Sequence, residues 1–101
     1  MEKRQKDLMV SVEKIEGVCP TFKIGQTFLI KDGYKLIADF PVCLHALQSI
    51  SPYYVALSRG IQPQELGLAG PDEAAYVQCL DPYRITGGGT VTFKIKKKNQ
   101  E

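Results

Sequence analysis

Three cysteines and one histidine are the residues of this chain best suited to chemistry. Together Cys19, Cys43, Cys79 and His45 form a complete Cys₃His set, which is one of the ligand sets that hold Zn²⁺ tetrahedrally. Structural zinc sites usually contain a local pair such as Cys-x-x-Cys, whereas these cysteines lie far apart in the sequence. The alternative is that they are ordinary thiols, because free cysteine is often buried simply as a small apolar side chain.

Cys43 is the best single candidate for a reactive thiol. A helix predicted to begin just after Pro41 would place its sulfur near unpaired N–H groups and the positive end of the helix dipole, which favour the thiolate. In the other interpretation, Cys43 heads an apolar stripe with Leu47 and Ile50 and is only packed. The sequence leaves both open.

His45 is the chain's one histidine and its only acid or base that titrates near neutral pH. On a helix its side chain would point about 200° away from that of Cys43, so the two could not meet. A Cys–His pair would need Cys19 or Cys79 to approach from another element. We therefore expect His45 to be exposed.

The elements that must position these residues follow from hydrophobic periodicity and turn residues. Alternation and β-branched runs predict strands, and the Asp32-Gly33 turn predicts a hairpin. Pro52 breaks a helical stripe, and Ser51-Pro52 is typical of an N-cap followed by the first residue of a helix, so we expect two short helices with Ser51 as the N-cap of the second. Residues 61–73 are predicted to be a loop. The expected strands lie near 8–15, 26–30, 35–38, 75–80 and 90–96, and the helical hairpin lies near 42–59. The predicted fold is α+β: a small, mostly antiparallel sheet or partly open barrel with the helical hairpin packed on one face.

Domain boundaries follow from the same patterns. Residues 8–96 are predicted to form one domain, residues 1–7 a disordered or frayed N-terminus, and residues 97–101 a basic C-terminal tail. Alternation at both ends of the domain suggests that the first and last strands pair. If they pair antiparallel, the basic residues near both ends of the chain come together at one corner.

Composition, hydrophobic runs and charge distribution argue against a membrane-spanning, a secreted and a nucleic-acid-binding protein. The chain has 101 residues, of which 44% are hydrophobic and 24% charged, values typical of one globular domain. No apolar run approaches the about 18 residues of a membrane span, and the first residues lack a secretory signal, so we expect a cytoplasmic protein with reduced thiols. The net charge of +2 comes from the two ends, which argues against a nucleic-acid-binding face.

Several segments together resemble a family of small, single-domain bacterial and archaeal proteins that has no assigned activity. The resemblance covers residues 8–96, and its most specific part is the order of three cysteine-centred segments. These are Gly17-x-Cys19, Cys43-x-x-Ala46 and Cys79-Leu80-Asp81-Pro82, followed by Gly88-Gly89-Thr90-Val91. The resemblance implies that the three cysteines belong to one pattern, but it supplies no reaction.

The leading hypothesis is a small cytoplasmic binding or accessory protein whose three cysteines share a site for a thiophilic metal such as zinc or iron. One alternative is a thiol-dependent enzyme or redox protein with Cys43 as its nucleophile. Another is a structural subunit, with a second copy or a different protein as partner. Tyr53 and Tyr54 favour the last alternative, because only one of them can lie on the helical stripe.

Overall fold

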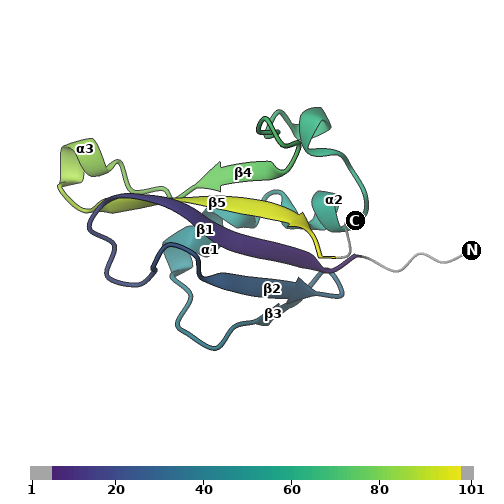
Figure 1. The fold of residues 1–101 in the computed structure, drawn as a ribbon, viewed down its shortest axis with the longest axis horizontal. Helices are drawn as coiled ribbons and strands as arrows, with labels where there is room; N and C mark the ends of the chain where they lie inside the picture. Colours follow the sequence, from purple (N-terminus) through teal and green to yellow (C-terminus); the bar gives the residue numbers. More distant parts are fainter. Residues whose placement is uncertain (1–5, 99–101) are drawn as a thin grey trace, which may run out of the picture.

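The structure is a computed structural model that describes residues 6–98. Within them, five strands form one open antiparallel sheet in the order β3-β2-β1-β5-β4 (Figure 1). The strands are β1 (Leu8–Gly17), β2 (Thr27–Lys31), β3 (Lys35–Ile37), β4 (Ala75–Gln78) and β5 (Gly89–Lys97). Two helices, α1 (Leu44–Ile50) and α2 (Tyr54–Ser58), cover one face. The predicted α+β class and helical hairpin are confirmed, and the sheet is open rather than closed into a barrel.

The long strands β1 and β5 form the centre of the sheet. They pair antiparallel from Leu8 opposite Lys97 to Gly17 opposite Gly89, as their alternating patterns predicted. Beyond the strands, the Lys98 amide donates to the Asp7 carbonyl oxygen at 2.8 Å. The two ends of the described chain therefore lie side by side.

β1 contains a bulge that changes which residues face the core. Val12 lies opposite Phe93 and Lys14 lies opposite Thr92, so Glu13 is the extra residue. The inward-facing residues change from even numbers, ending at Val12, to the odd-numbered Ile15, which packs against the core. The bulge thus keeps an apolar side chain inward on both sides of it.

The core lies between the sheet and its two covering helices. Phe93 is fully buried, and the Phe22 ring packs edge-on against it with 5.3 Å between ring centroids. The helices supply Ile50 and Leu57, both on the predicted stripe and both buried. One contiguous apolar cluster therefore holds the strands and the helical hairpin together.

The predicted hairpin at Asp32-Gly33 joins β2 to β3. Both residues have positive φ, 58° and 83°, and the Tyr34 amide donates to the Lys31 carbonyl oxygen at 3.1 Å. This is the conformation of a type I′ turn, for which Asp-Gly is a favoured pair. The Asp7 carboxylate fixes the turn by accepting a hydrogen bond from the Asp32 amide at 2.7 Å.

Ser51 was expected to start the second helix but instead ends the first. It has helical φ and ψ, and its amide donates to the Leu47 carbonyl oxygen. Tyr53 is the N-cap of α2, so the helical pair does break near Pro52, two residues later than the N-cap expected at Ser51. The reason is that helical backbone at Ser51 lets α1 complete its last turn before the proline.

Two short elements were not predicted. The segment expected to be a loop over 61–73 contains a 3₁₀ turn, η1 (Pro63–Leu66), and a one-turn helix, α3 (Tyr83–Thr86), precedes β5. Gln62 and Glu65 form a capping box around η1, with the Gln62 amide donating to Glu65 Oε1 at 2.9 Å. Both elements are too short to show periodicity.

The folded body extends slightly beyond the predicted limits of residues 8–96. The Lys6 amide donates to the Ser58 carbonyl oxygen at 2.7 Å, and Lys97 belongs to β5. Residues 1–5 and 99–101 of the expected tails lie outside the described residues. No helix within residues 6–98 combines the length and apolar character needed to cross a membrane.

Candidate functional site

The three cysteines follow or precede elements that meet at the helix-covered face. Cys19 follows β1, Cys43 is the N-cap residue of α1, and Cys79 follows β4. All three are half-buried and pack against the apolar core, and all three are free thiols. The structure thus places them on one core, although they come from distant parts of the sequence.

Each thiol has a different environment. The Cys19 sulfur accepts a hydrogen bond from the Phe22 amide at 3.4 Å. The Cys79 amide donates to the Val91 carbonyl oxygen at 2.8 Å, which continues the β4–β5 ladder. Cys43 has extended backbone, and its side chain does not cap the helix. It lies just before the first turn of α1 rather than within it.

The metal hypothesis depends on whether His, Cys, Asp or Glu side chains lie close enough together to share a metal ion. Within residues 6–98, no group of three His, Cys, Asp or Glu side chains is arranged to hold a metal ion. His45 is exposed on α1, as expected for a residue off the apolar stripe. A zinc or iron site at Cys19, Cys43, Cys79 and His45 therefore stays a prediction.

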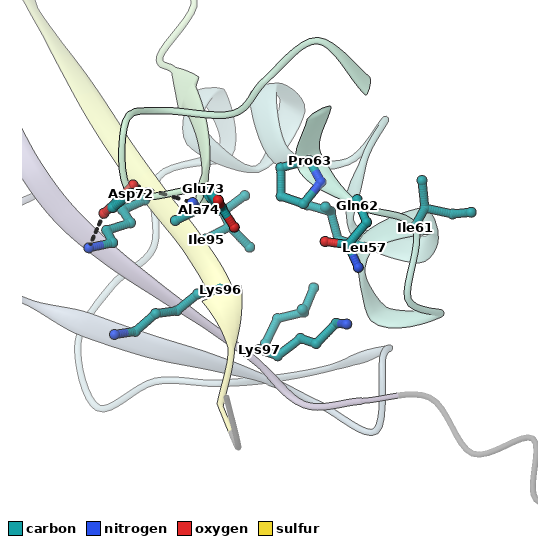
Figure 2. A pocket seen from close by; sticks show the side chains of 12 residues that line it. Leu57, Ile61, Gln62, Pro63, Asp72, Glu73, Ala74, Ile95, Lys96 and Lys97 are labelled. Carbon is teal, nitrogen blue, oxygen red and sulfur yellow. Dashed lines mark hydrogen bonds and ion pairs between the residues drawn. The ribbon is translucent and has the colours of Figure 1, made fainter. Parts of the chain in front are cut away.

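A cavity of about 390 Å³ lies at the other end of the sheet, beside the C-terminal half of β5. Its walls come from the end of α2, from residues 61–63 leading into η1, from residues 72–74 before β4, and from β5 (Figure 2). Buried Leu8, Leu57 and Ile95 line its interior. The cavity therefore joins the hydrophobic core to the surface.

Lys97 lines this cavity because of its place in β5. Side chains two residues apart in a strand share a face, so Lys97 continues the inward row of Val91, Phe93 and Ile95. It pairs across the strands with Leu8, which is buried. Figure 2 shows the Lys97 side chain extending toward the α2 side of the cavity, whereas Lys96, which also lines the cavity, extends to the opposite side of β5.

Glu73 reaches the cavity from the opposite wall. It ends a tight turn in which the Glu73 amide donates to the Gly70 carbonyl oxygen at 3.0 Å, and its φ is 68°. A non-glycine residue in this left-handed region is uncommon. The Glu73 carboxylate faces Gln62 and Pro63 across the cavity (Figure 2).

The adjacent Asp72 is already neutralised within the protein. The Lys94 ammonium lies 2.7 Å from its carboxylate, and the Tyr76 hydroxyl donates to it at 3.0 Å. The hydrogen bond from Lys94 is the largest cause lowering the pKa of Asp72 from 3.8 to about 2. The same bond raises the pKa of Lys94. In the described part of the chain, Glu73 and Lys97 form no such ion pair.

A second hollow of about 260 Å³ lies beside α3. Its polar groups are partly used inside the protein, because the Thr86 hydroxyl donates to the Asp81 carboxylate and Glu16 pairs with Lys14 at 3.0 Å. The Lys14 side chain also lowers the pKa of Glu16. The cavity beside β5 is larger and keeps opposite charges unpaired, so it is the better candidate site.

Sequence reasoning did not identify the residues of this cavity. Lys97 was assigned to a basic tail, although its alternation with Phe93 and Ile95 marks it as inward-facing. Glu73 and Gln62 fell in a predicted loop without a recognisable motif. Comparison of the chain with protein-family models, with curated protein sequences and with solved structures gave no match. Side-chain chemistry is therefore the basis for assigning a function.

Proposed function

We propose that this protein is a small ligand-binding protein and that the cavity beside β5 is its binding site. The observation that carries the proposal is the combination of buried apolar residues inside the cavity with opposite charges at its edge. Small-molecule sites typically have volumes of about 300–1,000 Å³, a largely apolar lining and a few polar groups that orient the ligand. The volume of the cavity lies in this range, and its lining is divided evenly between apolar residues and polar or charged residues.

Ligand screening by NMR on the full chain tests this proposal. Fragments that bind should shift the backbone amide signals of Leu57, Ala74 and Ile95, which line the cavity. Signals from α3 and from the β2–β3 turn provide an internal control, because those segments lie outside it. Binding confined to other surfaces, or no binding by any fragment, would contradict the proposal.

The three-cysteine site is a second candidate, supported by the packing of all three thiols against one core. In this proposal Cys19, Cys43 and Cys79 hold zinc or iron after a local rearrangement, with His45 as an additional ligand. Metal analysis of protein purified without added metal should then find bound metal, and cysteine-to-serine variants should lower its amount. Substoichiometric metal with no affinity on titration would exclude this candidate.

Two other hypotheses have their own tests. A nucleophilic Cys43 should react with an alkylating agent faster than Cys19 or Cys79 at neutral pH, and equal rates would remove its support. A structural subunit should form a stable homo-oligomer or co-purify with a partner protein, and a monomer without partners would argue against it. The proposed cytoplasmic location can be examined by cell fractionation.

A further inference from the structure

We infer that the cavity beside β5 recognises a small zwitterion: an amino acid with an apolar side chain, carboxylate toward Lys97 and ammonium toward Glu73. This inference rests on the proposed function and adds the chemical class of the ligand. Its basis is the placement of Lys97 and Glu73, which have opposite charges and no ion pair among the described residues, on different walls of a cavity with an apolar interior. Lys96 also lines this cavity.

Lys97 ends the inward-facing row of β5 that contains Phe93 and Ile95. The pairing of β4 with β5 stops at Ala75 opposite Ile95, so β5 is an open edge on this side at Lys97, where an inward-facing lysine also discourages pairing with another strand. The aliphatic part of Lys97 can pack beside Leu8 while its ammonium reaches the cavity. A ligand carboxylate would give this ammonium a charge-assisted hydrogen bond.

Glu73 is the matching negative group. Its neighbour Asp72 has its charge balanced by Lys94 at 2.7 Å, which leaves Glu73 as the acidic side chain of the cavity without an ion pair in the described chain. The turn from Gly70 to Glu73 is closed by hydrogen bonds on both sides, including the Gly70 amide to the Ala74 carbonyl oxygen at 2.9 Å. The turn therefore holds the Glu73 carboxylate at the cavity wall.

The charges of the two walls discriminate among simple ligands. An anion without an ammonium group would be attracted by Lys97 but repelled by Glu73, and an amine without a carboxylate would meet the opposite pair of forces. A zwitterion satisfies both groups at once. The apolar part of the lining, which includes the exposed Ile61 as well as the buried Leu57 and Ile95, then faces the apolar side chain of the ligand.

L-Leucine and three analogues provide the first test, by NMR titration of the full chain. 4-Methylpentanoate lacks the ammonium group, 3-methylbutylamine lacks the carboxylate, and glycine lacks the apolar side chain. We expect leucine to bind, and each charge-deleted analogue to bind about tenfold or more weakly. Equal binding of leucine and either charge-deleted analogue would overturn the inference.

Two single substitutions assign each charge to its partner group. Lys97→Met should weaken leucine binding about tenfold or more and remove the preference for leucine over 3-methylbutylamine. Glu73→Gln should remove the preference for leucine over 4-methylpentanoate. The matched controls are Lys98→Met and Glu13→Gln, which change the same residue types on exposed positions that do not line the cavity. Unchanged preferences in the Lys97 and Glu73 variants would overturn the inference.

The outcome separates failure of the inference from failure of the proposed function. If other fragments bind in the cavity but leucine, valine and phenylalanine do not, the zwitterion assignment is wrong and the binding function stands. If neither amino acids nor fragments shift the cavity signals, both fail. Binding of leucine with shifts at Leu57 and Ile95 supports both.

Discussion

Asp72 makes the stability of the fold depend on pH. Its pKa is lowered to about 2 in the folded protein, mainly by the hydrogen bond from Lys94, with further hydrogen bonds from the Ala74 amide and the Tyr76 hydroxyl. The unfolded chain binds the proton more tightly, at the ordinary pKa of 3.8. The stabilisation is therefore fully present above pH 3.8 and is lost as the pH falls toward about 2.

The prediction is that NMR titration of the Asp72 carboxyl group will give a pKa well below 3.8. Lys94→Met should raise that pKa toward its ordinary value, because it removes the largest stabilising partner of the carboxylate. Lys98→Met is the matched control, since Lys98 is exposed and does not line the cavity that Asp72 and Lys94 share. An Asp72 pKa that does not respond to Lys94→Met would contradict the role given to this ion pair.

Lys97 shows which part of the candidate site could be predicted from the sequence. Alternation along β5 indicates that Lys97 faces inward, but it does not indicate what lies opposite. Glu73 and Gln62 reach the cavity through a turn and a 3₁₀ segment whose paths depend on tertiary packing. The cysteines drew attention because of their chemistry, whereas the cavity depends on residues that are common on protein surfaces.

Among the elements, the strands and the two main helices were predictable because their side chains repeat with a clear period. In β1 the apolar, inward-facing residues change from even-numbered positions, ending at Val12, to the odd-numbered Ile15. This change can be seen in the sequence, and it marks the position of the bulge. The elements η1 and α3 have four residues each and could not be found from periodicity. Their local signals are caps and turn residues, such as Gln62 with Glu65 and Gly87 after α3.

The bulge gives a prediction about deletions in β1. Deleting Glu13 should leave a regular strand in which Val12 still faces Phe93 and Ile15 still faces the core. Deleting Ser11 should instead turn Val12 outward and bring Glu13 toward Phe93. Losing the burial of one valine costs about 1.5–3 kcal/mol, and the buried carboxylate adds to that cost.

Urea denaturation of both deletion variants measures this difference. We expect the Ser11 deletion to be the less stable by at least about 2 kcal/mol, because only it reverses the inward-facing row. Equal stability of the two variants would show that the register of β1 does not depend on this bulge.

For the whole molecule, stability depends on one core shared by the sheet and helices. Phe93 is 0% exposed and lies at its centre, against Phe22. Phe93→Ala should cost about 3–5 kcal/mol, a large fraction of the about 5–15 kcal/mol that stabilises a typical domain. Leu44 is 72% exposed on α1, so Leu44→Ala should change stability by less than about 0.5 kcal/mol.

Thermal and urea denaturation of these two variants provide the measurement. A large loss for Phe93→Ala with little change for Leu44→Ala is the expected result. Similar losses in both variants would mean that the exposed surface of α1 is covered by another molecule in solution. The same experiment therefore also bears on whether the protein has a stable partner.

The hydrogen bond between Lys98 and Asp7 has a consequence for chain connectivity. Because the two ends of the described fold are adjacent, a short linker could join them without crossing the molecule. New ends could then be opened between Ala38 and Asp39, which are both exposed in the segment between β3 and α1. Such a circular permutant would keep every strand pairing while making β1 and β5 neighbours in sequence as they are in space.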